Sequence, residues 1–152
     1  MSFKKSSVQN RLNLNFYLEQ ELVLENCEFL LQNETVIKVP CVFQIWTKQQ
    51  NQREKVKLPT TTSLFDFVNK ERADLRIQRV GGNAGKASLD LNRSPSSNYF
   101  VKNNTALSND EFVNFINSLT FPTIEFTVGP KSLSKGELIA IIEENIGNFK
   151  KI

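Results

Sequence analysis

Residues 39–46 read Val-Pro-Cys-Val-Phe-Gln-Ile-Trp, an apolar run that only one Gln interrupts. The polar residues Thr-Lys-Gln-Gln-Asn follow it directly at 47–51. A strand with apolar side chains on both faces is typical of the centre of a sheet that is covered on both sides. We therefore expect a buried strand here, covered by the C-terminal strand and helices of the chain. The alternative is that its apolar face and sheet edge stay open for a partner.

Local patterns on both sides of this run predict further helices and strands. Alternating apolar and polar side chains predict strands, and Ser followed three residues later by Glu predicts the start of a helix. In chain order we expect a helix at 6–14, a strand at 16–24, a hairpin with arms at 27–31 and 35–39, a helical turn at 63–70, strands at 74–80, 98–102 and 123–128, and helices opening after Ser108 and Ser134. This order predicts an α/β domain, or an α+β domain if the sheet is truncated, with a mixed, partly antiparallel sheet and C-terminal helices.

The composition narrows the chemistry that the chain can perform. Its 152 residues fit one domain, and twelve Phe supply much of the core volume. Two cysteines, Cys27 and Cys41, and no histidine exclude Ser-His-Asp triads and His-based acid–base catalysis and argue against a zinc site. We expect both thiols to be reduced core residues. No pair of carboxylates stands out as an acid–base couple, so we assign no catalytic residue and no metal ligand.

The net charge does not identify a partner, whereas the N-terminal sequence and the lengths of the apolar runs bear on the compartment. The net charge of +3 permits contact with nucleic acid without requiring it. The basic N-terminus, residues 1–5, is followed by no apolar segment of the kind that signal peptides have. No apolar run approaches the about 18 residues that a membrane span needs. We expect a cytoplasmic protein with no membrane partner.

The strongest local signal is the segment 81–86, Gly-Gly-Asn-Ala-Gly-Lys. Its glycines permit positive φ and close backbone approach, so its amides could cradle a phosphate while Lys86 adds charge. It is not a Walker A loop, because only three residues separate Gly81 from Gly85 and Ala87 follows the Lys. The alternative is a wide turn that needs glycine, and both interpretations stay open.

Basic side chains with aromatic neighbours surround this segment. Such a mixture is used by proteins that bind nucleic acid, and it is also found on ordinary solvated faces. The basic and aromatic residues concerned are Arg76, Arg79, Lys86, Arg93, Lys102, Tyr99 and Phe100. Our candidates for nucleic-acid binding are Arg76, Arg79, Gly81, Gly82, Lys86, Arg93 and Tyr99.

The order of several segments resembles a known family. Residues 2–5, 7–12, 16–18 and 39–46, taken together, resemble the back half of a class I, S-adenosylmethionine-dependent methyltransferase. The resemblance is to the adenine-N6 DNA methyltransferases and their phage and bacterial restriction-modification relatives. It implies the second half of a Rossmann-like sheet, in which Phe16–Leu24 and Cys41–Thr47 form a closing antiparallel pair. Residues 79–86 and 97–100 resemble the segment that follows the methyltransferase core.

The departures from the family limit what the resemblance implies. The family binds its cofactor with a Phe-x-Gly-x-Gly loop and performs its chemistry with Asn/Asp-Pro-Pro-Phe/Tyr, and this chain contains neither. No catalytic or cofactor-binding residue can therefore be assigned by resemblance. The family's base-stacking aromatic has its nearest counterpart at Phe29, for which we favour the alternative of an apolar residue on a hairpin.

The resemblance leads to one expected function and leaves one alternative. The expected function is that of a partial methyltransferase, the DNA-side portion, with residues 1–105 forming the methyltransferase-like sheet and Gly-rich segment and residues 106–152 closing the same domain. Such a chain is inactive alone or is complemented by a protein partner that supplies the missing half. It needs no cofactor by itself, whereas the intact family uses S-adenosylmethionine. The alternative is a non-enzymatic nucleic-acid-binding or regulatory module.

Overall fold

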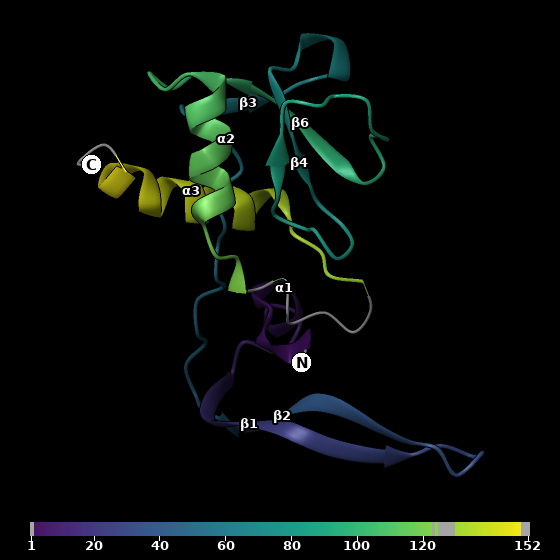
Figure 1. The fold of residues 1–152 in the computed structure, drawn as a ribbon. Coiled ribbons are helices and arrows are strands. Elements are labelled where there is room, and N and C mark those ends of the chain that lie inside the picture. Colours follow the sequence, from purple (N-terminus) through teal and green to yellow (C-terminus); the bar gives the residue numbers. More distant parts are fainter. Residues whose placement is uncertain (1, 123, 125–129, 150–152) are drawn as a thin grey trace. The chain divides into compact units, whose positions relative to one another are not determined.

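A computed structural model describes residues 2–122, 124 and 130–149. The chain forms two compact units, Met1–Lys57 and Leu58–Ile152 (Figure 1). All strand pairings are antiparallel among the described residues, and the helices are segregated from the strands, so the fold is α+β. This is the class expected for a truncated sheet. The division falls after Lys57, whereas we expected a segment boundary after residue 105.

The first unit is a long hairpin preceded by short helical turns. Its elements are a 3-10 turn at Ser2–Lys4, α1 at Ser6–Gln9, β1 at Phe16–Leu30 and β2 at Val36–Lys48. The helix is shorter than the expected 6–14 because Asn side chains form hydrogen bonds with backbone groups outside the helix. The Asn10 amide donates to the Val56 carbonyl over 2.8 Å, and Asn13 Oδ1 accepts from the Asn15 amide over 3.0 Å. Such local bonds compete with helical ones.

The pairing of β1 with β2 confirms the antiparallel partnership expected for Phe16–Leu24 and Cys41–Thr47. The register runs from Phe16 opposite Lys48 to Leu30 opposite Val36, with irregularities that place an extra residue of β1 after Leu18 and after Leu24. The hairpin tip also lies where the sequence predicts it. Glu34 adopts a positive φ of 61° there, and the Leu31 amide donates to the Thr35 carbonyl.

The burial expected for residues 39–46 is wrong. These residues lie in β2, one of only two strands in the described part of this unit, and the two strands form a long twisted ribbon (Figure 1). Phe43, in the middle of the apolar run, is 57% exposed. Side-chain type alone predicts burial, but burial requires further layers, and no other strand or long helix belongs to this unit in its described residues.

The second unit contains a four-stranded sheet in the order β3-β6-β4-β5, next to which two helices cross (Figure 1). Its elements are β3 at Phe65–Phe67, a 3-10 turn at Lys70–Arg72, β4 at Leu75–Gln78, β5 at Ala87–Ser88, β6 at Asn98–Asn103, α2 at Asn109–Ser118 and α3 at Lys135–Phe149. The helical turn expected at 63–70 is wrong for its first part. Phe65 is buried, Asp66 is exposed and both pair with β6, which is the period of a strand. The strand expected at 123–128 lies outside the described residues, apart from Ile124.

One apolar core holds the second unit together. Residues from the strands and from both helices share it, which is why residues 106–149 belong with 58–105. The buried members are Phe65, Leu75, Ile77, Ala87, Val101, Phe112, Phe115, Ile116, Phe121, Leu133, Leu138, Ile139, Ile142 and Ile146. None of the described helices is long and apolar enough to cross a membrane.

Both predicted capping boxes are present. Ser108 Oγ accepts from the Glu111 amide over 3.3 Å, and Glu111 Oε2 accepts from the Ser108 amide over 2.7 Å. Ser134 and Glu137 repeat this geometry before α3, with distances of 3.3 and 2.8 Å. Each box satisfies backbone amides that the first helical turn leaves without a partner.

Candidate functional site

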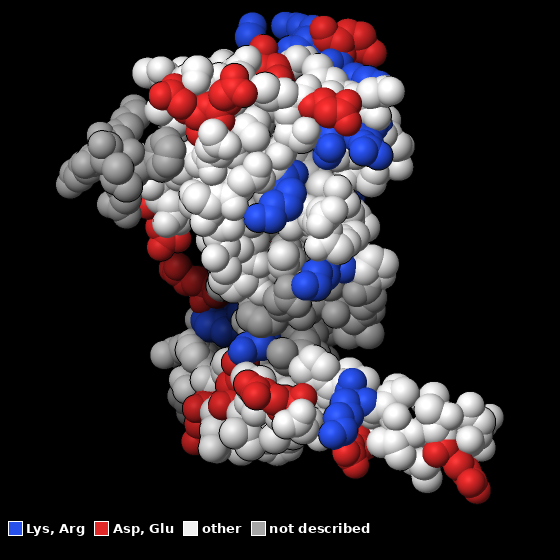
Figure 2. Space-filling model, viewed as in Figure 1, with Lys and Arg blue, Asp and Glu red and all other residues white. Residues whose placement is uncertain are grey.

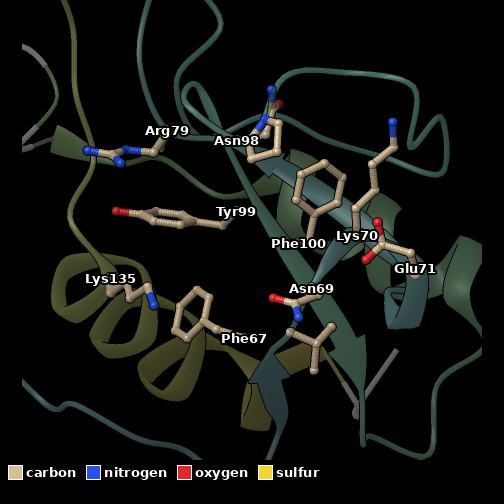
Figure 3. A pocket seen from close by; sticks show the side chains of 11 residues that line it. Phe67, Asn69, Lys70, Glu71, Arg79, Asn98, Tyr99, Phe100 and Lys135 are labelled. Atoms are coloured by element: carbon tan, nitrogen blue, oxygen red, sulfur yellow. The ribbon is translucent and has the colours of Figure 1, made fainter.

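A pocket of about 520 Å³ opens in the second unit (Figure 3). Strands β3 and β6, the turn after β3, the residue after β4 and the first residue of α3 contribute to its wall. Its lining residues are Phe67, Val68, Asn69, Lys70, Glu71, Arg79, Pro95, Asn98, Tyr99, Phe100 and Lys135. The pocket therefore combines aromatic surface with several cations.

Two aromatic rings form the apolar part of the pocket. Phe67 on β3 and Tyr99 on β6 meet edge to face, with centroids 5.3 Å apart and ring planes at 67°. The Tyr99 hydroxyl donates to the Leu133 carbonyl over 3.0 Å, which fixes the ring. Burial raises the pKa of Tyr99, while the charge of Arg79 opposes that rise. Tyr99 is therefore a neutral aromatic surface at physiological pH.

Two cations lie against these rings. The Arg79 guanidinium carbon is 5.4 Å from the Tyr99 centroid, and Lys135 Nζ is 4.4 Å from the Phe67 centroid. In Figure 3 the Tyr99 ring lies between Arg79 on one side and Phe67 and Lys135 on the other. Cation–π attraction explains why both long side chains stay beside the rings.

The backbone of Arg79 is anchored, but its side chain is not fully satisfied. Its amide donates to the Ser97 carbonyl over 2.9 Å, and its carbonyl accepts from the Leu133 amide over 2.8 Å. Its Nε is buried, and no acceptor in the described part of the chain bonds to it. A buried donor on a charged group without a partner is costly, so the position of Arg79 is not explained by hydrogen bonding of its Nε within the protein.

Lys135 occupies a position that helix stability does not explain. It is the first residue of α3, where the positive end of the helix dipole disfavours a cation. Of the described residues lining the pocket, only Glu71 is acidic. Lys70, Arg79 and Lys135 place three cations around this pocket, which suits an anionic ligand, while the end of α3 is already capped by the Glu137 carboxylate.

The structure brings together two of the predicted residues, Arg79 and Tyr99, and adds two that the sequence interpretation missed. Phe67 was missed because residues 63–70 were interpreted as helical; the alternation Phe65-Asp66-Phe67 was the available signal. Lys135 was missed because it was treated as part of a capping box. Its unfavourable charge at a helix start was the signal for it.

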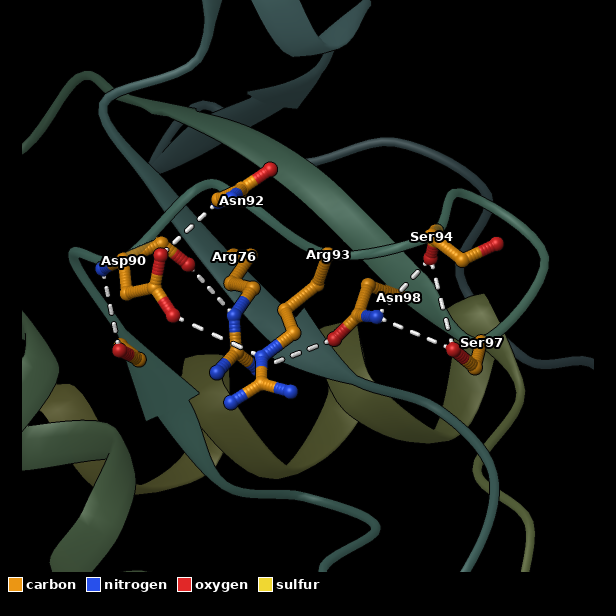
Figure 4. Close-up of polar contacts among 8 residues, drawn as sticks. Arg76, Asp90, Asn92, Arg93, Ser94, Ser97 and Asn98 are labelled. Carbon is orange, nitrogen blue, oxygen red and sulfur yellow. Dashed lines mark hydrogen bonds and ion pairs between the residues drawn. The ribbon is translucent and has the colours of Figure 1, made fainter.

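The predicted candidates Arg76 and Arg93 lie in a separate cluster around Asp90 (Figure 4). Arg76 donates to the Asp90 carbonyl over 2.6 Å and to Asn98 Oδ1 over 3.0 Å. Arg93 Nε lies 3.5 Å from Asp90 Oδ2. The Asn92 amide, which donates to Asp90, and the two arginines lower the pKa of Asp90. Both arginines thus have acceptors within the protein and neither lines the pocket.

The Gly-rich segment 81–86 forms the turn that joins β4 to β5. The amides of Gly81, Ala84, Gly85 and Lys86 donate to carbonyls of the protein itself. Lys86 Nζ donates to the Asn117 carbonyl at the end of α2 over 3.1 Å. Four of the six amides are therefore already used, which favours the turn over a phosphate cradle for this segment.

The other predicted positions are placed as follows. Gly82 is exposed within the same turn. Phe29 belongs to β1 of the first unit, where it pairs with Ile37 and is 47% exposed. On the face of the second unit that Figure 2 shows, Lys and Arg side chains are interspersed with Asp and Glu.

Comparison of the chain with protein-family models, with curated proteins and with solved structures finds no match. The functional argument therefore depends on the geometry of the pocket.

Proposed function

We propose that the second unit binds single-stranded DNA, or an unpaired segment of DNA, in the pocket of Phe67, Tyr99, Arg79 and Lys135. The observation that carries the proposal is the pair of cations held against two aromatic rings, Arg79 beside Tyr99 and Lys135 beside Phe67, in one pocket. A nucleotide offers a phosphate to the cations of the pocket and a planar base to its aromatic side chains. The chain then acts as a nucleic-acid-binding module without chemistry of its own.

The expected energies are those of proteins that bind single strands. A base stacked on an aromatic side chain contributes about 1–3 kcal/mol, and this contact tolerates any base sequence. Phosphate contacts add an attraction that weakens with salt as counterions are released. A duplex keeps its bases stacked inside, so it offers this pocket only phosphates.

The test is fluorescence anisotropy with a labelled oligothymidylate of about 12 nucleotides, a length within the usual range of sites for single strands. Arg79→Gln and Lys135→Gln should each weaken binding by about 1.5 kcal/mol, or roughly tenfold in Kd. Lys102→Gln is the matched control, because Lys102 is an exposed cation of β6 outside the pocket. It should leave the Kd within about twofold of the wild-type value.

Salt dependence separates pocket contacts from general attraction. Two phosphate contacts predict a slope of about −1.4 for log K against log salt concentration, and loss of either cation reduces its magnitude by about 0.7. Tyr99→Leu should weaken binding without changing the slope, because it removes stacking surface and no charge. Equal effects of Lys102→Gln and Lys135→Gln would show that the pocket is not the site.

A second candidate is the DNA-side portion of a split methyltransferase. The observation in its favour is the antiparallel pairing of residues 16–24 with 41–47, which is the arrangement that the family resemblance implies. This candidate predicts that the chain alone binds no S-adenosylmethionine and that a protein partner supplies the cofactor half. Isothermal titration calorimetry tests it, and appreciable binding of S-adenosylmethionine by the isolated chain would contradict it.

A further inference from the structure

The β1–β2 hairpin of the first unit has two faces of different character. No extra residue interrupts β2, so its alternate residues point to opposite faces throughout. We call the side that carries Phe43 the apolar face. Its cross-strand pairs are Tyr17–Thr47, Gln20–Ile45, Leu22–Phe43, Leu24–Cys41, Cys27–Val39 and Phe29–Ile37.

The opposite face already has partners within its own unit. Lys4 forms an ion pair with Glu21 at 2.8 Å, and Gln44 donates to the same carboxylate over 2.6 Å. The Arg53 guanidinium lies 5.6 Å from the centroid of the Trp46 ring. The N-terminal segment and Arg53 thus cover part of this face and leave the apolar face without a counterpart among the described residues of its own unit.

The apolar face is exposed to an extent that a stable hairpin does not tolerate. Phe43, Leu22 and Phe29 are 57%, 52% and 47% exposed, and Ile45, Val39, Ile37 and Leu24 are exposed as well. A two-stranded hairpin is at best marginally stable in water unless its apolar side packs on something. A contiguous exposed patch of this kind marks an interaction surface.

We propose that a second copy of this chain covers the apolar face, with the two hairpins packed face to face about a twofold axis. In such an interface each patch meets itself, so like charges within it would repel. The six cross-strand pairs of the apolar face contain no charged residue, which makes the face complementary to itself. Two sheets packed through apolar faces form the two-layer sandwich that antiparallel proteins commonly use.

The size of the apolar face agrees with a dimer. Its seven exposed apolar residues are between 37% and 57% exposed. With about 150 Å² for each large side chain, they offer roughly 500 Å² of apolar surface. A standard interface buries about 800 Å² on each partner, of which the polar rim supplies the remainder. Glu19, whose carboxylate accepts from the hydroxyl of Thr47 in the Tyr17–Thr47 pair, has the place of such a rim.

The cysteines provide a direct readout of this surface. The chain contains only Cys27 and Cys41, both are free, and both belong to the apolar face. Their rate of reaction with a thiol reagent therefore reports whether the face is covered. Burial, together with the neighbouring Cys41 thiol, raises the pKa of Cys27, so rates must be compared at one alkaline pH.

The experiment combines light scattering after size exclusion with thiol kinetics over a range of protein concentrations. The wild-type chain should have twice the mass of the monomer, and its thiols should react at least about tenfold more slowly at concentrations where the dimer forms. Phe43→Glu should be monomeric and should react quickly at every concentration. Val36→Glu places the same charge on an exposed residue of the opposite face of β2 and should behave as wild type.

Each other result would overturn the proposal. A wild-type monomer with slowly reacting thiols would mean that the chain covers its own face, and a monomer with fast thiols would mean that the face awaits a different protein. A dimer whose thiols react quickly would place the interface elsewhere. If Phe43→Glu fails to fold, Leu22→Glu replaces it, and the concentration dependence of the wild-type thiols remains decisive in either case.

Discussion

Gly82 and Gly85 lie in the same turn but stand under different constraints. Gly85 has a positive φ of 91°, and a Cβ atom added to it would lie 2.6 Å from Cδ2 of Phe121, a core residue. Gly82 has no heavy atom within 4 Å of the corresponding position and is exposed. The glycine requirement of the segment 81–86 therefore comes from turn geometry and packing at particular residues.

Gly85→Ala should lower the free energy of unfolding by about 1–3 kcal/mol, because it adds backbone strain and a steric clash with a core ring. Gly82→Ala is the matched control and should change it by less than about 0.5 kcal/mol. Urea denaturation followed by circular dichroism measures both. Equal destabilisation by the two variants would contradict this account of the turn.

At the scale of single residues, the sequence identified basic and aromatic candidates but did not show which of them share a site. It identified Arg79 and Tyr99 as candidates, and the structure places them in one pocket. The sequence also made Arg76 and Arg93 candidates. In the structure, however, Arg76 donates to the Asp90 carbonyl and Arg93 forms an ion pair with the Asp90 carboxylate. The local sequence does not show whether a basic side chain has a hydrogen-bond acceptor within the protein, because the acceptors come from other segments of the chain.

Among the elements, α2 begins at the residue that the sequence predicts, because a capping box is a local device. Ser108 and Glu111 are three residues apart and exchange hydrogen bonds with each other's backbone amides. These bonds lower the pKa of Glu111, with the Ser108 side chain as the largest cause. A folded-state pKa below the unfolded one gives stability that is present at neutral pH and is lost as the pH falls through the lowered value.

Ser108→Ala should therefore cost about 1 kcal/mol of stability at neutral pH. The difference from wild type should shrink in acid, as Glu111 becomes protonated and its bond with the Ser108 hydroxyl weakens. Asn114→Ala, an exposed change in the middle of the same helix, should be neutral or slightly stabilising. Thermal unfolding at several pH values measures all three proteins. A Ser108→Ala effect that grows in acid would show that the cap is not the cause.

The molecule consists of two units, and among the described residues only the second has a buried apolar core. All buried members of the core cluster lie between Phe65 and Ile146, and every residue that lines the pocket lies in the same unit. The first unit offers the hairpin and its apolar face instead. Folding and the proposed DNA binding thus belong to the second unit, and the proposed association belongs to the first.

Residues 58–152 produced as a separate chain should consequently fold and bind the oligothymidylate with a Kd within about twofold of that of the full chain. The same chain should be monomeric, because it lacks the apolar face. Circular dichroism, anisotropy and light scattering measure these properties. A dimer formed by residues 58–152 would contradict the assignment of association to the hairpin.

The sequence by itself determined what short-range chemistry controls. Alternation indicated β4, and the turn residues 94–97 indicated the start of β6. The two Ser-Glu pairs indicated the starts of α2 and α3, and the residues around Asn33 indicated the hairpin tip. Only the tertiary structure decided burial and sites. The run at 39–46 has the composition of a central strand but lies in an exposed ribbon, because composition does not state how many layers the chain can supply. Arg79 and Lys135 are 56 positions apart in the sequence (135 minus 79), and only the packing of α3 beside β6 brings both cations to one pair of rings.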